Sequence, residues 1–112
     1  MSIKPDVENI LIQLGYPVNE ATTKQLQAII DNTPGFFEFA KHIFSLNDEL
    51  KKLDATVAMS NSQNYLKLKC DSKDDAEIAE FKDIINHWAD KYKVKLQQVK
   101  NKNTYYILGK NS

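Results

Sequence analysis

The chain has 112 residues, 42% of them hydrophobic, and its 15 basic side chains balance 15 acidic ones. This length suits one domain with a single core, and the balanced composition excludes a disordered chain or a strongly basic protein. All 15 basic side chains are lysines, so the chain has no arginine. It therefore lacks the planar guanidinium group that recognises guanine and binds phosphate or carboxylate groups in a bidentate way.

Helical periodicity dominates the first half of the chain, residues 1–53. A first helix is expected over about residues 5–14, because apolar side chains recur there at steps of three and four and Gly15 follows. A second helix is expected over about residues 19–31, with Asn19 as its N-cap.

The third helix is the most apolar of the predicted helices. Thr33 followed by Pro34 indicates its start, and the periodicity continues to Leu53. Phe37 and Phe44 widen its apolar face beyond a narrow stripe. We therefore expect this helix to be buried on much of its circumference.

The second half of the chain carries the patterns of two hairpins. The first hairpin is expected to pair residues 56–60 with residues 64–70, where apolar and polar side chains alternate. The second hairpin should pair residues 93–99 with residues 104–108. Residues 109–112 are predicted to be a frayed end.

A fourth helix should connect the hairpins, from a capping residue at Ser72 to Tyr92. The fold class is therefore α+β: an amino-terminal three-helix segment, then a hairpin-helix-hairpin (ββαββ) unit whose four-stranded antiparallel sheet is covered by the fourth helix. The pattern predicts one domain over residues 1–112 and leaves the strand order open. The residues expected to be largely buried between this helix and the sheet are Ile78, Phe81, Ile85, Trp88, Leu66, Leu68, Val94 and Leu96.

Lysines and tyrosines are expected to share the outward face of the sheet. Such a face can bind single-stranded nucleic acid, because rings stack on bases and ammonium groups meet phosphates. A solvated sheet face gives the same pattern. The residues concerned are Tyr65, Lys67, Lys69, Lys93, Lys95 and Tyr106.

The last strand, residues 104–108, is bulky on both faces, so either the amino-terminal helices or another molecule should cover its second face. No catalytic, cofactor-binding or metal-binding pattern is recognised. Asp83, His87 and Asp90 share one helical face with spacing that can hold a metal, but an exposed polar face explains them. His42 is expected to be a helix-surface or hydrogen-bonded core histidine and not a catalytic base. The single cysteine, Cys70, alternates inward and is expected to behave as a small apolar residue.

The sequence therefore favours a small protein-interaction or scaffolding module over an enzyme, and leaves open whether it is a homodimer. A protein partner or a second copy of the chain would meet apolar surface of the third helix, which carries Phe37 and Phe44, or of the last strand. Single-stranded nucleic-acid binding through the Tyr/Lys face is the alternative. No cofactor and no membrane association are expected. A lone cysteine and the polar residues after Met1 predict a cytoplasmic location.

Overall fold

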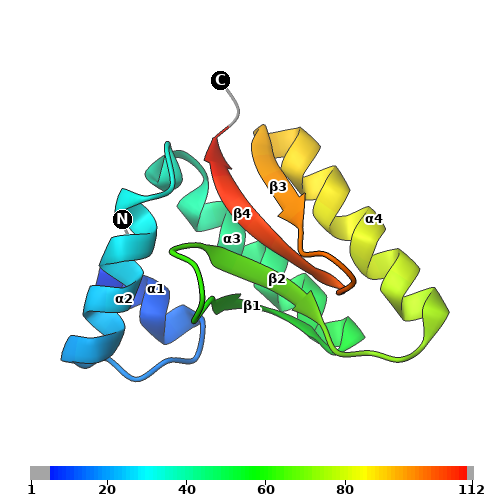
Figure 1. Cartoon of the computed structure of the whole chain (residues 1–112), viewed down its shortest axis with the longest axis horizontal. Helices are drawn as coiled ribbons and strands as arrows, with labels where there is room; N and C mark the ends of the chain where they lie inside the picture. Colours follow the sequence, from blue (N-terminus) through cyan, green and yellow to red (C-terminus); the bar gives the residue numbers. More distant parts are fainter. Residues whose placement is uncertain (1–5, 111–112) are drawn as a thin grey trace.

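The computed structural model describes residues 6–110 and has the predicted α+β class, with three helices followed by strands, a helix and strands (Figure 1). The elements are α1 (Val7–Gln13), α2 (Glu20–Asp31), α3 (Phe36–Leu50), the 3₁₀ helix η1 (Lys51–Leu53), β1 (Ala55–Met59), β2 (Leu66–Cys70), α4 (Asp75–Tyr92), β3 (Val94–Gln98) and β4 (Thr104–Lys110).

Polar side chains set the starts of the first two helices. The Asp6 carboxylate accepts a hydrogen bond from the Asn9 backbone at 2.8 Å and caps α1. Asn19 caps α2 as predicted, and it forms a reciprocal capping box with Thr22.

The start of α3 differs from the prediction. Thr33 does not cap this helix, because its hydroxyl donates instead to the Ile29 carbonyl of the preceding helix at 2.6 Å. The N-cap is Gly35, which adopts a left-handed conformation with φ of 68° and makes no side-chain cap. A sharp reversal between α2 and α3 therefore replaces the expected Thr-Pro start.

The sheet has the strand order β1-β2-β4-β3, and all neighbouring strands are antiparallel. Each hairpin contributes one central and one edge strand. The two hairpins meet through β2 and β4, where Leu66 pairs with Ile107 and Lys67 pairs with Tyr106.

The carboxyl end of the chain corrects the prediction of fraying from Gly109 onward. Gly109 is buried and belongs to β4, and the Lys110 amide donates to the Pro34 carbonyl at 2.7 Å. The final strand therefore docks on the turn between α2 and α3. Residues 111–112 lie outside the described residues.

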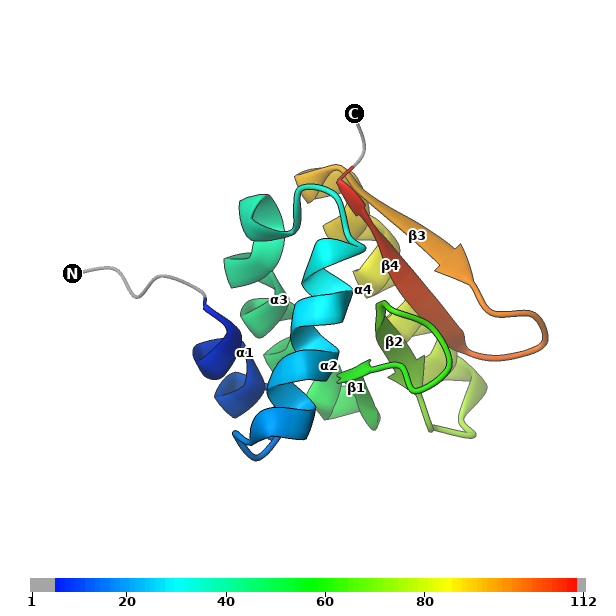
Figure 2. The ribbon, with the colours of Figure 1, turned by 60° about the vertical axis from the view of Figure 1, so that its left-hand side comes forward.

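Helices α3 and α4 lie against one face of the sheet, while no described helix lies over the other face (Figures 1 and 2). The prediction that the fourth helix covers the sheet is confirmed, but α3 shares that position. Phe81, Ile85, Trp88, Leu66, Leu68 and Val94 are buried as expected. Ile78 and Leu96 are only half-buried. Ile78 lies near the amino-terminal end of α4, and Leu96 lies on the edge strand β3.

The inward side chains of the sheet join those of the helices in one hydrophobic core. Cys70 faces this core, as its alternation with Leu66 and Leu68 predicted. No helix within residues 6–110 combines the length and the apolar character needed to cross a lipid bilayer.

Candidate functional site

Two tyrosines lie side by side on the open face of the sheet. Their ring centroids are 5.7 Å apart and the ring planes differ by 33°. Tyr65 directly precedes β2, and Tyr106 lies on the neighbouring strand β4 opposite Lys67. Both rings are half-buried, so each keeps part of its surface exposed to solvent. The sequence had grouped these tyrosines with the outward lysines, and the strand pairing brings them together.

The lysines of this face differ in their surroundings. Lys67 lies beside Tyr106 in the register of the two central strands. Lys69 is 3.7 Å from the Asp71 carboxylate, so part of its charge is balanced. Lys95 lies on edge strand β3.

Lys93 was predicted to lie on the outward face of the sheet, and this prediction is wrong. It is the C-cap of α4 and has a positive φ of 57°, so it forms the reversal between the helix and β3. The strand begins one residue later, at Val94. The predicted surface therefore keeps Lys67, Lys69 and Lys95 as its strand lysines.

A hollow of about 270 Å³ lies beside Tyr106 on the same face. The loop between β1 and β2 reaches it, and the Ser62 hydroxyl lies 3.4 Å from the Tyr106 hydroxyl. The turn between β3 and β4 forms the opposite wall. The lining side chains are Ser60, Asn61, Ser62, Lys67, Val99, Lys102, Thr104 and Tyr106.

The polar groups of this hollow lower the pKa of the Tyr106 phenol below its ordinary value. The hydrogen bond with Ser62 is the largest cause, followed by Ser60, while burial acts in the opposite direction. The positive charges of Lys67 and Lys102 lower the pKa further. The hollow therefore favours negative charge on an oxygen atom.

Charge is distributed unevenly along the chain, although its net charge is zero. Residues 55–70 contain two lysines and residues 91–110 contain six, and neither segment contains an aspartate or glutamate. These two segments carry all four strands and both hairpin connections. All 15 carboxylates lie elsewhere, in residues 1–54 and 71–90. The sheet is therefore basic and the helices and their connections carry the acidic residues.

The predicted apolar contact residues Phe37 and Phe44 lie on α3, in the helical layer. Phe37 is 54% exposed, and its ring meets Phe36 edge-on at 5.4 Å. Phe44 is half-buried against the core. The two phenylalanines are therefore not part of the Tyr/Lys face.

A larger groove of about 570 Å³ lies between α3 and α4. Both histidines line it: His42 stacks on Tyr92, and His87 lies on α4 with Asp83. Burial is the first cause that lowers the pKa of His42, followed by the charges of Lys41, Lys91 and Lys110. Among residues 6–110, no three side chains of the His, Cys, Asp or Glu type form a group that could hold a metal ion.

Sequence reasoning missed Ser60, Ser62, Lys102 and Thr104. These residues lie in or beside two separate hairpin connections, and only the pairing of β2 with β4 brings them to one hollow. The absence of acidic residues from residues 55–70 and 91–110 was a usable signal in the sequence.

The chain matches no known family model, and no curated protein or solved structure is significantly similar to it.

Proposed function

We propose that this protein is a binding module that holds single-stranded nucleic acid on the open face of its sheet. The observation that carries the proposal is the Tyr65–Tyr106 pair, with ring centroids 5.7 Å apart, on a sheet that contains lysines and no carboxylate. Bases stack on exposed aromatic rings, while lysines neutralise the phosphates between them.

The distribution of charge favours nucleic-acid binding over the protein-interaction role that the sequence analysis favoured. A net charge of zero argued against a polyanionic partner, yet the strands themselves carry lysines and no carboxylate, and Asp71 beside Lys69 follows the end of β2. The apolar face of α3, which was expected to meet a partner, is mostly buried in the core of the chain. The buried side chains are Phe36, Phe39, Ile43 and Leu46.

The absence of arginine sets the expected specificity. Lysine acts as a compact point charge and cannot make the bidentate contacts by which arginine reads guanine. Stacking on tyrosine tolerates any base. We therefore expect weak discrimination between sequences and a preference for single strands, whose bases are free to stack.

Fluorescence anisotropy with a labelled single-stranded oligonucleotide of random sequence tests the proposal. If the strand displaces counterions at Lys67, Lys69, Lys95 and Lys102, log K should fall with log salt concentration at a slope of about −2.8, or about −0.7 per contact. A matched duplex should bind more weakly, since its bases are already stacked. No anisotropy change at low salt would overturn the proposal.

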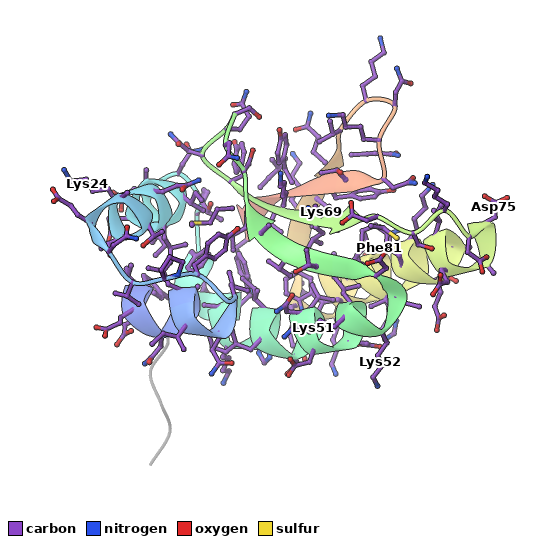
Figure 3. The ribbon with its side chains drawn as sticks, turned by 90° about the horizontal axis from the view of Figure 1, so that it is seen from below. Lys24, Lys51, Lys52, Lys69, Asp75 and Phe81 are labelled. Carbon is purple, nitrogen blue, oxygen red and sulfur yellow. The ribbon has the colours of Figure 1, made fainter. Side chains whose placement is uncertain are left out.

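Charge reversal on the face gives the corresponding variant test. The double change Lys67→Glu and Lys69→Glu should abolish binding, because it places two carboxylates on the face that carries the tyrosine pair. The matched control is Lys51→Glu with Lys52→Glu, which alters the same charge on the α3 side of the molecule, away from the sheet (Figure 3). Equal loss in both double variants would indicate a net-charge effect and contradict a binding face.

A second candidate is a protein partner or a second copy of this chain at the exposed ring of Phe37. Its support is the 54% exposure of that side chain beside the turn that carries Pro34. Light scattering over a concentration series tests it: association should be weakened by Phe37→Ser and unaffected by Lys67→Glu. A monomer at all concentrations would contradict self-association.

The proposed location is the cytoplasm. Its support is that Cys70, the single cysteine, is buried and forms no disulfide within the chain. Fractionation of the native cells, with detection of the untagged protein, tests the location.

A further inference from the structure

The geometry points to a phosphate-binding site in the hollow beside Tyr106, where Lys67 and Lys102 would hold a backbone phosphate of the bound strand. This inference deepens the proposed function and rests on it, since it names where one phosphate of the nucleic acid lies.

The side chains that line the hollow suit an anion. Four hydroxyl groups and two ammonium groups surround the hollow, and no carboxylate lines it. Hydroxyl and ammonium groups are donors that suit phosphate oxygens, and a carboxylate would repel them. Within residues 6–110, neither Lys67 nor Lys102 makes an ion pair, so both charges are available to an anion.

The hydroxyl groups of the hollow are held close to one another. The Ser60 Oγ accepts hydrogen bonds from the Ser62 and Gln63 amides at 3.3 Å, which fixes the loop. Ser60 Oγ and Ser62 Oγ are 3.4 Å apart, and Ser62 Oγ is 3.4 Å from the Tyr106 hydroxyl. These hydroxyl contacts are long compared with the usual O–H···O distance of about 2.7–2.8 Å. The hydroxyl hydrogens can therefore turn toward an anion at small cost.

The same groups act on the Tyr106 phenol. Ser62 and Ser60 lower its pKa, and the charges of Lys67 and Lys102 add to that effect. Donors and positive charges that favour the ionised phenol would favour a phosphate oxygen in the same way.

Tyr106 connects the hollow to the stacking surface. Its ring packs beside Tyr65, while its hydroxyl reaches the hollow at Ser62. A base stacked on the tyrosine pair and a phosphate in the hollow are therefore held by opposite parts of one side chain. This arrangement suits a nucleotide unit of a single strand, in which base and phosphate are joined through one sugar.

Two probes test the site directly. Inorganic phosphate should shift the backbone amide signals of Ser62 and Lys102 in the NMR spectrum of the labelled protein, and sodium chloride of equal ionic strength should not. An oligonucleotide with neutral methylphosphonate linkages should bind many-fold more weakly than its phosphodiester counterpart and leave those amides unshifted.

Variants separate this site from general attraction to the sheet. Ser62→Ala removes a donor without changing charge, so it should weaken oligonucleotide binding several-fold with an unchanged salt slope. Lys102→Ala should weaken binding and reduce the slope by about 0.7. Lys95→Ala is the control, because it removes an equal charge from the sheet outside the hollow and should leave the phosphate-induced shifts intact. Ser62 and Lys102 are exposed, so both variants should fold.

The outcomes distinguish the two proposals. If the oligonucleotide binds and Ser62→Ala and Lys102→Ala bind as the wild type does, the phosphate site is wrong while the proposed function stands. If inorganic phosphate shifts these amides but no oligonucleotide binds, the hollow is a site for free phosphate and the nucleic-acid function is wrong. If neither probe has an effect, both proposals fail.

Discussion

The imidazole of His42 and the phenol ring of Tyr92 stack face to face, with centroids 3.9 Å apart and planes within 13°. The neighbouring Trp88 ring donates its Nε1–H to the His42 carbonyl oxygen at 3.1 Å. These contacts join α3 to α4, the two helices that cover the sheet. The charge on His42 therefore affects the packing between the two helices.

Stability should fall in acid partly through His42. Burial, together with Lys41, Lys91 and Lys110, lowers the pKa of His42 below its ordinary value of 6.5. The unfolded chain then binds a proton more readily than the folded one. The stabilising contribution of neutral His42 is therefore present above pH 6.5 and is lost as the pH falls through the folded-state pKa.

Urea denaturation at a series of pH values measures this contribution. His42→Gln should flatten the decline in unfolding free energy below pH 6.5 relative to the wild type, even though the lost stacking lowers stability at every pH. His87→Gln is the control for removing an imidazole from the same groove. An unchanged pH profile in His42→Gln would contradict the assignment.

Gly109 should be intolerant of any side chain. A Cβ there would lie 2.8 Å from Pro34 Cδ and 2.9 Å from the Pro34 carbonyl oxygen, and the φ of 140° is strained for other residues. We expect Gly109→Ala to lower the free energy of unfolding by about 1–3 kcal/mol, through overpacking and backbone strain.

Gly15→Ala is the matched control for this change. Gly15 also has a positive φ, of 84°, but nothing lies within 4 Å of its added Cβ. Its cost should be that of the backbone alone, about 1 kcal/mol. Chemical denaturation compares the two, and equal losses would show that contact with Pro34 does not matter.

The outer edge of β1, which no described strand pairs, should depend on two side chains from the helical half. The Val57 amide donates to Asn47 Oδ1 and the Met59 amide donates to the Tyr16 hydroxyl, both at 3.0 Å. These bonds satisfy donors that an edge strand otherwise leaves unpaired. Asn47→Leu should therefore cost about 1–3 kcal/mol, since it leaves a buried donor unsatisfied, and Tyr16→Phe about 1 kcal/mol.

Hydrogen exchange gives a residue-level check of this edge. Asn47→Leu should speed exchange at the Val57 amide, while Tyr16→Phe should speed exchange at the Met59 amide. Each variant thereby serves as the control for the other. If both amides keep the protection they have in the wild type, the side chains do not close this edge.

Local patterns in the sequence predicted most of the fold. The Asn19 cap and the alternation of Leu66, Leu68 and Cys70 depend on neighbouring residues, and the structure confirms both. Thr33 and Pro34 were predicted to mark the start of the third helix, but α3 begins at Phe36, because the Thr33 hydroxyl bonds to the preceding helix and Gly35 makes the reversal. The local Thr-Pro pattern does not show that the hydroxyl has this alternative acceptor.

The candidate site could be predicted only in part. Alternation along β2 placed Tyr65 and Lys67 on one face, and outward alternation added Tyr106. The strand order brings Tyr106 beside Lys67, and it also brings Ser62 and Lys102 to the same hollow. Long-range pairing of this kind depends on the whole core, and no local pattern encodes it.

The facing of α4 offers the sharpest test of the core. Phe81 is fully buried between this helix and the sheet (Figure 3). Its neighbour in the chain, Glu80, is exposed. Phe81→Ala should lower the free energy of unfolding by about 3–5 kcal/mol, since it removes a large buried ring and leaves a cavity. Glu80→Ala should change it by no more than about 0.5 kcal/mol. Denaturant titration of both variants decides the matter, and a loss at Glu80 as large as that at Phe81 would show that this face of α4 does not pack on the sheet.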